Sequence, residues 1–127
     1  MKITFSASVA VTVVVNDVND NAPTCSPSTY IATVAELSTS TNVITLSCTD
    51  SDTTTANNVI TYAIASGNTG SNFAIDSSSG LITSSSSASL DYESVTSYTL
   101  VVTATDSGST PLSSSATIYI VVTGRIR

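Results

Sequence analysis

The sequence predicts an all-β fold, a seven-stranded Greek-key β-sandwich with immunoglobulin-like topology. First, β-branched residues dominate the chain, and no stretch repeats its apolar residues at helical spacing. Second, short segments with alternating apolar residues are separated by clusters of Gly, Ser, Asn, Asp and Pro. Third, a length of 127 residues with 41% hydrophobic residues suits one domain with its own core and a short appendage.

Seven segments after residue 28 are expected to form the strands. They are Thr29–Ala35, Asn42–Cys48, Val59–Ala65, Asn72–Ile75, Leu81–Ser84, Ser97–Ala104 and Ser115–Thr123. The segments between them are rich in turn residues, for example 50–57 and 106–112. Alternation within the strands predicts a mostly aliphatic core, because aromatic residues make up only 6% of the chain. The residues expected to be buried are Ile31, Val43, Leu46, Ile60, Tyr62, Ile64, Phe73, Ile75, Leu81, Tyr98, Leu100, Val102, Ile118 and Ile120.

An internal repeat predicts the domain boundaries. The segment from Ser6 to Val15 matches the segment from Ser113 to Val122 in character, at a separation of about one sandwich domain. We therefore expect residues 1–15 to be the last strand of a preceding, incomplete repeat. Residues 16–23 then form a linker, and residues 24–127 form the complete repeat.

Composition excludes several classes of function. The net charge of −6, with only three Lys and Arg residues, provides no means of holding nucleic acid. The absence of histidine argues against zinc, copper or iron sites and removes the usual general base. No stretch is long enough to cross a bilayer, so we expect this fragment to make no direct membrane contact. Cys25 and Cys48 are compatible either with one disulfide or with two buried thiols.

The nine acidic residues are the most informative feature of the sequence, because eight of them fall at loops or strand ends. Asp50, Asp52 and Asp106 follow the second and sixth strands, which places them at the pole where the linker enters. Glu36, Asp91 and Glu93 fall at the opposite pole, and Asp76 is expected to be an ordinary turn residue. Calcium takes six to eight oxygen ligands from loops that converge in this way. The sequence therefore predicts Ca²⁺ bound between successive domains.

The segment from Asp17 to Pro23 resembles the DxNDNxP linker of cadherins. Further segments resemble cadherin-repeat motifs in the same order: Val34-Ala35-Glu36, Asp50-Ser51-Asp52, Asn57 ahead of Ile60-Thr61-Tyr62, Phe73-Ala74-Ile75-Asp76, Leu90-Asp91-Tyr92-Glu93 and Ala104-Thr105-Asp106-Ser107-Gly108. The resemblance covers essentially the whole chain. It implies a repeat of a calcium-dependent adhesion ectodomain of a plasma-membrane protein, and it implies no enzymatic activity.

The resemblance also implies roles for individual residues. The ion nearest this domain would be bound by Asp50, Asp52, Asp106, the Asn19 side chain and the backbone carbonyls of Asn21 and Asn57. Asp17, Asp20 and the Val18 carbonyl would serve two further ions that are shared with the preceding repeat. Glu36, Asp91 and Glu93 would face a following linker, for which residues 124–127 provide no acidic ligands.

The partners that the resemblance implies are neighbouring cadherin repeats and cadherin ectodomains on the same or an apposed cell. The loop after Asp52 lacks a glycine that is common in the family, so Asn57 and Asn58 remain alternatives for the carbonyl ligand. An alternative function is a calcium-independent immunoglobulin-like or fibronectin-like interaction module. A hydrolase with paired carboxylates is disfavoured, because short loops leave little room for a cleft.

Overall fold

The computed structural model describes residues 4–12, 18–52 and 55–124, and in this part of the chain it forms a β-sandwich. Its elements in chain order are β1 (Thr24–Cys25), β2 (Thr29–Ala35), β3 (Asn42–Thr45), β4 (Cys48–Thr49), α1 (Thr55–Asn58), β5 (Thr61–Ser66), the 3-10 turn η1 (Thr69–Ser71), β6 (Phe73–Ile75), β7 (Leu81–Ser84), β8 (Ser97–Thr105) and β9 (Ser113–Thr123). Neither short helix is long enough to span a bilayer, and the described residues contain no other helix.

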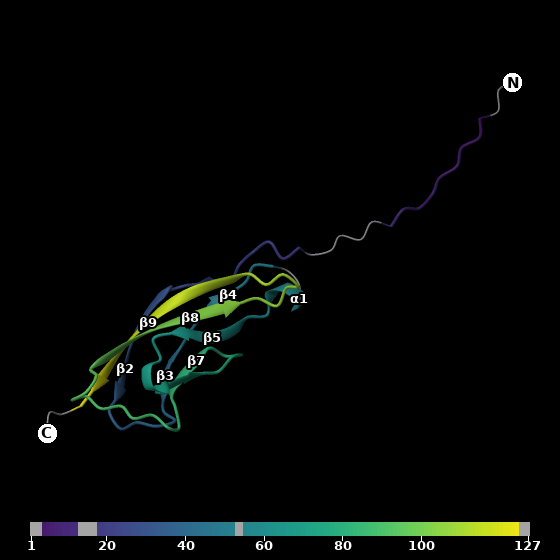
Figure 1. The fold of residues 1–127 in the computed structure, drawn as a ribbon. Helices are drawn as coiled ribbons and strands as arrows, with labels where there is room; N and C mark the ends of the chain where they lie inside the picture. Colours follow the sequence, from purple (N-terminus) through teal and green to yellow (C-terminus); the bar gives the residue numbers. More distant parts are fainter. Residues whose placement is uncertain (1–3, 13–17, 53–54, 125–127) are drawn as a thin grey trace.

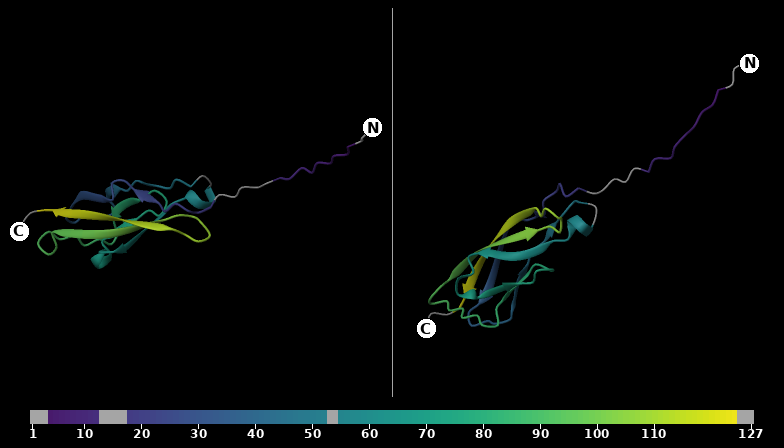
Figure 2. Two further views of the ribbon diagram at one scale, coloured as in Figure 1. Left: turned by 90° about the horizontal axis from the view of Figure 1, so that it is seen from above. Right: turned by 45° about the vertical axis from the view of Figure 1, so that its right-hand side comes forward.

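The strands form two main sheets and a short ribbon (Figure 1). One sheet has the order β2-β9-β8-β5, the other has the order β3-β7-β6, and β1 pairs with β4. All the pairs are antiparallel except β2 and β9, which are parallel. The described segment 4–12 lies apart from the sandwich at one end, and β9 runs toward the other end (Figure 2). Loops at the two ends therefore form two separate poles.

The core lies between the two main sheets and is mainly aliphatic, as the composition predicts. Burying each large apolar side chain contributes about 1.5–3 kcal/mol to folding. Phe73 and Tyr98 add an edge-to-face contact, with ring centroids 5.1 Å apart. The largest fully buried apolar side chains are Ile82, Leu90, Leu100, Ile118, Ile120, Val102 and Val122.

The predicted strands are largely confirmed, and Thr29–Ala35 and Leu81–Ser84 have the expected boundaries. The expected strand Asn42–Cys48 is instead divided into β3 and β4. The division occurs at Ser47, whose N–H donates to the Tyr30 hydroxyl (3.0 Å) rather than to a strand neighbour. Neither β1 nor the helix α1 was predicted, because two-residue strands and single helical turns have no periodicity to detect.

The prediction of burial is wrong for two residues. Ile31 is 74% exposed, because β2 directs Tyr30 and Val34 toward the core and Ile31 toward solvent. Tyr30 can be buried because its hydroxyl donates to the Ser47 carbonyl as well as accepting from its N–H. In β7, Leu81 is only half-buried and Ile82 is fully buried in its place. The remaining predicted residues are buried or pack partly buried against the core.

The N-terminal segment has no strand between residues 4 and 12, and its Phe5, Val9 and Val11 side chains are exposed. Part of the predicted strand 1–15, at 1–3 and 13–15, lies outside the described residues. The last strand of a repeat pairs within the sheet of that repeat, so the sandwich described here does not test the assignment of residues 1–15 as such a strand. That assignment, and the division into residues 1–15, 16–23 and 24–127, stay predictions.

Candidate metal centre

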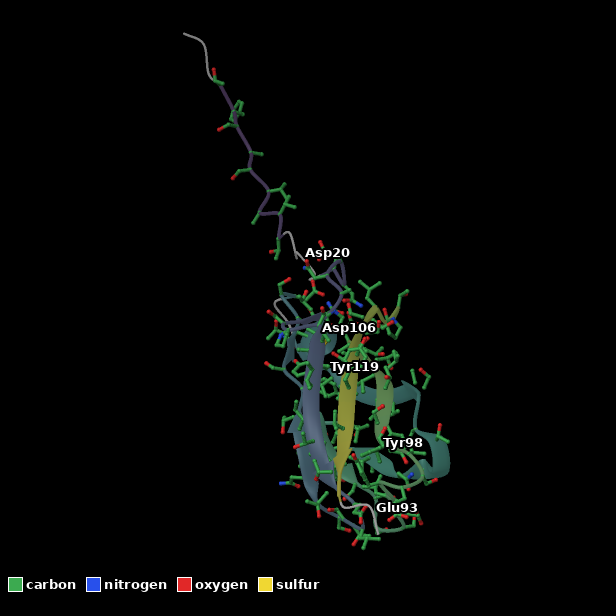
Figure 3. All side chains as sticks on the ribbon, turned by 90° about the vertical axis from the view of Figure 1, so that its left-hand side faces the viewer. Asp20, Glu93, Tyr98, Asp106 and Tyr119 are labelled. Atoms are coloured by element: carbon green, nitrogen blue, oxygen red, sulfur yellow. A yellow bond between two sulfur atoms is a disulfide. The ribbon has the colours of Figure 1, made fainter. Side chains whose placement is uncertain are left out.

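Three carboxylates meet at the pole where the chain enters the sandwich. Asp50 and Asp52 follow β4, and Asp106 follows β8. One oxygen atom from each of the three lies within 4.8 Å of the others. Asp52 and Asp106 are buried, and Asp50 is half-buried. Figure 3 labels Asp106 at this pole beside Asp20 of the linker. The fold thus brings together the acidic residues that the sequence placed at this end.

The linker lies directly on this cluster. The Asn19 amide Nδ2 donates to Asp106 Oδ1 (2.9 Å) and to the Thr110 carbonyl (3.0 Å). Asn21 contacts Asp52 twice, through its backbone N–H (3.3 Å) and through Nδ2 (2.8 Å). Linker residues therefore bind one carboxylate from each of the two loops that form the pole.

The chain after the linker is also fixed to the sandwich. The Ser114 hydroxyl donates to the Pro23 carbonyl, and Cys25 forms a disulfide with Cys48. These two cysteines lie opposite each other in the β1–β4 pairing, and Cys48 lies two residues before Asp50. Of the two alternatives that the sequence left open, the structure contains the disulfide. It joins the entry segment to the strand that carries the Asp50–Asp52 loop.

Three buried oxygen atoms in this cluster have no hydrogen-bond partner. They are Asn19 Oδ1, Asp50 Oδ2 and Asp106 Oδ2. The other oxygen of each carboxylate is occupied, since Asp50 Oδ1 accepts from the Asp52 N–H (2.8 Å) and Asp106 Oδ1 accepts from Asn19, Gly108 and Leu112. A buried acceptor without a partner costs about 1–3 kcal/mol, and more when it is charged. All three are hard oxygen ligands of the kind that calcium binds, so the residues fit this ion.

The electrostatics of the pole also favour a cation. The only basic residues of the chain are Lys2, Arg125 and Arg127, and there is no histidine. None of the described residues therefore carries a positive side chain that could neutralise the cluster.

Burial raises the pKa of Asp50, and repulsion from Asp52 and Asp106 adds to the effect, while the Asp52 N–H opposes it. Burial also acts to raise the pKa of Asp52 and Asp106. Hydrogen bonds outweigh this effect of burial and hold both pKa values below the ordinary range. The main ones are donated by Asn21 to Asp52, and by Leu112 and Asn19 to Asp106. Two carboxylates of the cluster are thus held in the charged form that binds a metal.

Gly108 is a residue of the site to which the sequence assigned no role. A Cβ atom at this position would overlap the Asn19 side chain, so only glycine lets the loop after Asp106 approach the linker. Ser107 was also missed, and its Oγ accepts the Val59 N–H (3.1 Å) beyond α1. Both residues belong to the Asp106-Ser107-Gly108 motif, which was therefore the available signal.

The remaining predicted residues of this pole lie near the cluster in different ways. Asp20 accepts from the Asn21 side chain (3.0 Å), and the Val18 carbonyl accepts the Asp20 N–H (2.9 Å). Asn57 is buried and lies beside Asn19 and Val18, where the three line a common cavity. The Asn58 side chain donates to the Asp52 carbonyl (3.1 Å), so both alternatives for the carbonyl ligand lie close to the cluster. Asp17 lies outside the described residues.

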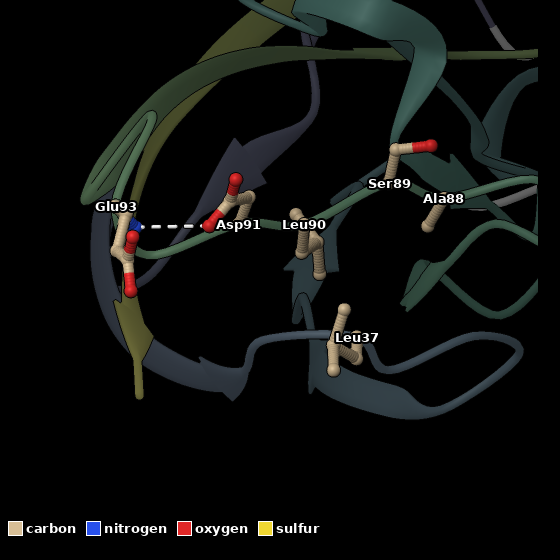
Figure 4. A pocket seen from close by; sticks show the side chains of 6 residues that line it. All are labelled: Leu37, Ala88, Ser89, Leu90, Asp91 and Glu93. Atoms are coloured by element: carbon tan, nitrogen blue, oxygen red, sulfur yellow. Dashed lines mark hydrogen bonds between the residues drawn. The ribbon is translucent and has the colours of Figure 1, made fainter. Parts of the chain in front are cut away.

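Glu36, Asp91 and Glu93 lie at the opposite pole, as predicted. Glu36 Oε2 accepts the Tyr92 N–H (3.1 Å), and Asp91 Oδ1 accepts the Glu93 N–H (3.0 Å). Asp91 and Glu93 line a cavity of about 500 Å³ together with Leu37 and Leu90 (Figure 4). Gly124 lies against Glu36, where a Cβ atom would overlap the carboxylate. This acidic pole therefore borders the end of β9, where the chain leaves the sandwich.

The two-sheet topology defines a class, the immunoglobulin-like β-sandwiches. The sequence profile described as the cadherin domain matches residues 30–123. The chain belongs to the cadherin domain family.

Named relatives support this assignment. The chain is 43% identical to mouse (Mus musculus) Protocadherin Fat 4 over 109 residues, which cover 85% of this chain and 2% of that protein. It is 46% identical to human (Homo sapiens) Cadherin EGF LAG seven-pass G-type receptor 2 over 105 residues, which cover 82% of this chain and 3% of that protein. The chain thus spans only a few per cent of the length of these relatives.

Solved structures share the fold. The chain superposes on a structure of extracellular cadherin domains 3–6 of Protocadherin Gamma B2 with a TM-score of 0.79, and on a structure of domains 1–5 of the same protein with a TM-score of 0.80, both at 29% identity. In the second of these structures the match covers 88% of this chain and 22% of that chain. The matched structures contain several repeats in tandem, so the sandwich described here corresponds to one repeat of such an array.

Proposed function

We propose that this chain is a calcium-binding extracellular repeat of a membrane-anchored adhesion protein, in which calcium stiffens the junction with the preceding repeat. The observation that carries the proposal is the set of three buried, unpartnered oxygens on Asn19, Asp50 and Asp106. They converge from the linker and from two loops of the sandwich, in a region without any basic residue. Family membership adds that calcium binding is characteristic of this type of repeat. We propose no catalytic activity.

The ligands of the ion nearest the sandwich are Asn19, Asp50, Asp52 and Asp106 through side-chain oxygens, and Asn21 and Asn57 through backbone carbonyls. Asp17, Asp20 and the Val18 carbonyl are proposed to serve further ions together with the preceding repeat. Calcium supplies positive charge that the chain itself lacks at this pole. Because its ligands come from both the linker and the sandwich, binding fixes one relative to the other.

Glu36, Asp91 and Glu93 are proposed to form half of a second junction, with a following repeat. Neighbouring repeats are thus the immediate partners of this domain, and ectodomains on the same or an apposed cell are the proposed partners of the whole protein. The observation that favours calcium over the calcium-independent alternative is again the unpartnered oxygens, which an ordinary interaction module has no reason to bury.

Thermal unfolding with and without calcium tests the proposal. A site with a dissociation constant of about 10⁻⁴–10⁻³ M is typical of extracellular modules, and calcium at about 100 times that constant stabilises the fold by about 2.7 kcal/mol. We expect the parent chain to melt several degrees higher in calcium than in EDTA, and Asp50→Asn to lose most of this gain. Asp76→Asn is the matched control, because the Asp76 carboxylate accepts the N–H groups of Ser78 and Ser79 in an exposed turn outside the cluster.

The control should respond to calcium as the parent chain does. Equal melting temperatures with and without calcium in the parent chain would refute the proposed site, and an undiminished gain in Asp50→Asn would remove Asp50 from it. Magnesium at the same concentration separates calcium binding from screening by a divalent ion, because the proposed ligand set suits the larger ion.

A further inference from the structure

The disulfide between Cys25 and Cys48 joins the two segments that bring ligands to the proposed calcium site. Cys25 belongs to the entry segment, residues 18–26, and lies four residues after Asn21. Cys48 lies two residues before Asp50, and the chain contains no other cysteine. One covalent bond therefore ties the entry segment to the loop that carries the carboxylates, and thiol–disulfide exchange can open and close it.

Strand β4 keeps its position through contacts other than the disulfide. The Tyr62 hydroxyl accepts the Cys48 N–H (3.2 Å), and the Tyr30 hydroxyl accepts the Ser47 N–H (3.0 Å). Both tyrosine side chains are buried in the core. Opening of the disulfide is therefore expected to leave β4 and the core beside it in place.

The entry segment is held less firmly. Its strand β1 pairs with β4 over only two residue pairs and belongs to neither main sheet. The Ser26 N–H donates to the Ser47 carbonyl (3.3 Å), and the buried Pro23 accepts the Ser114 hydroxyl through its carbonyl. Without the disulfide, the entry segment depends on contacts of this kind, so it should open more readily than the strands of the sandwich.

We propose that the Cys25–Cys48 disulfide is a thiol–disulfide exchange site that controls calcium affinity, so that the oxidised chain binds calcium more tightly than the reduced chain. The inference rests on the proposed function, because it concerns the same calcium site. In the oxidised chain, Asn19 and Asn21 are held against carboxylates of the cluster before the ion arrives. In the reduced chain, calcium binding must also order the entry segment, which weakens it.

The reductant that the proposal requires is a dithiol, which opens a protein disulfide in two exchange steps. Cys48 is half-buried and Cys25 is buried, so the first attack is expected at Cys48. A sulfur of the dithiol bonds to Cys48 Sγ, the bond between the two cysteines breaks, and Cys25 Sγ takes its electron pair and a proton. The second sulfur of the dithiol then displaces Cys48 Sγ, which also takes a proton. The products are two protein thiols and the cyclic disulfide of the reagent.

The effect is reciprocal by thermodynamic linkage. If the disulfide strengthens calcium binding by a certain factor, bound calcium favours the oxidised form over the reduced form by the same factor. We expect a factor of about ten, toward the lower end of the usual range for such coupling. The effect is moderate because Pro23 is buried and should keep part of the entry segment in place after reduction.

Calcium titration of the full chain, followed by amide NMR shifts before and after reduction with dithiothreitol, tests the proposal. We expect the dissociation constant to rise about tenfold on reduction. Cys25→Ser with Cys48→Ser should behave like the reduced chain. Val34→Ala is the matched control, because it weakens the buried core and leaves the disulfide and the ligands unchanged. Its calcium affinity should equal that of the parent chain.

A second measurement needs no calcium. In EDTA, reduction should speed amide hydrogen exchange in residues 18–26 and leave exchange in β8 and β9 unchanged. Unfolding of the whole sandwich on reduction overturns the proposal, because the disulfide then supports the fold rather than the entry segment. Equal calcium affinity of the oxidised and reduced chains overturns this inference alone, whereas an oxidised chain that binds no calcium overturns the proposed function as well.

Discussion

At the scale of single residues, the candidate site combines strong local order with incomplete satisfaction of its polar atoms. Asp106 Oδ1 accepts three N–H groups, while Oδ2 of the same carboxylate is buried without a partner. Backbone and amide donors thus fix the position of the carboxylate and leave one oxygen for a cation. An arrangement of this kind stabilises the bound state at the expense of the calcium-free fold.

Asp50 should show this cost directly. Burial and its acidic neighbours raise its pKa, so the stability that it contributes is present below the ordinary value of 3.8 and is lost as the pH rises through the raised value. At neutral pH the ionised Asp50 therefore destabilises the calcium-free fold. Asp50→Asn keeps the Oδ1 acceptor for the Asp52 N–H and removes the charge.

We expect Asp50→Asn to melt at a higher temperature than the parent chain in EDTA at pH 7, and the difference to shrink below pH 3.8, where Asp50 is protonated. In millimolar calcium the order should reverse, because only the parent chain gains from the ion. Differential scanning calorimetry in the two buffers and at the two pH values measures both effects. A variant that is less stable than the parent chain in EDTA would show that Asp50 is not under strain from its neighbours.

Most residues of this site could be predicted from the sequence, because Asp50, Asp52, Asp106 and the linker asparagines occur in short ordered motifs. Gly108 and Ser107 could not be assigned a role, since their contribution is the close approach and hydrogen bonding of a loop. Such contacts depend on where the linker lies in space, and sequence spacing does not contain that information.

At the scale of elements, strand positions follow from the spacing of turn residues, whereas the face of a strand that is buried follows from its register. In β2, the choice lay between Tyr30 with Val34 and the set that includes Ile31. Ile31 is the more apolar residue, and its burial was therefore predicted wrongly. The deciding contact is the pair of hydrogen bonds between the Tyr30 hydroxyl and Ser47, which joins residues 17 positions apart.

The register of β2 can be tested by shortening two of its side chains to alanine, one buried and one exposed. Val34 is 5% exposed, and Val34→Ala should lower the free energy of unfolding by about 1–3 kcal/mol through the lost burial and the cavity. Ile31→Ala removes more apolar atoms from an exposed position and should change it by less than about 0.5 kcal/mol. Urea denaturation of both variants measures the difference. A larger loss for Ile31→Ala would mean that β2 presents its other face to the core.

At the scale of the whole molecule, the distribution of charge is the dominant property. The chain has nine acidic residues and three basic ones, and none of the basic residues lies among the described residues. Carboxylate repulsion is therefore concentrated at the poles and has no internal counter-charge. The strands contain no charged residue, so the lateral faces remain neutral and the candidate metal ligands are confined to the poles.

This distribution predicts a salt dependence of stability. In calcium-free buffer, raising sodium chloride from about 0.01 to about 0.5 M should raise the melting temperature, because the Debye length falls from about 30 Å to less than 10 Å. The gain should be smaller in Asp50→Asn, which has less repulsion to screen, and unchanged in Asp76→Asn. Circular dichroism during heating measures it. A melting temperature that is independent of salt would show that repulsion at the poles contributes little to the stability of the calcium-free fold.

The parallel pairing of β2 with β9 determines how the domain responds to tension. The two strands are joined over seven residue pairs, from Thr29 and Thr117 to Ala35 and Thr123. The linker leads to the start of β2, and the chain leaves the sandwich after the end of β9. A force applied between the two poles therefore pulls the strands along their length in opposite directions. It loads all of their hydrogen bonds together in shear, rather than opening them one after another as it would in a hairpin pulled from its two ends.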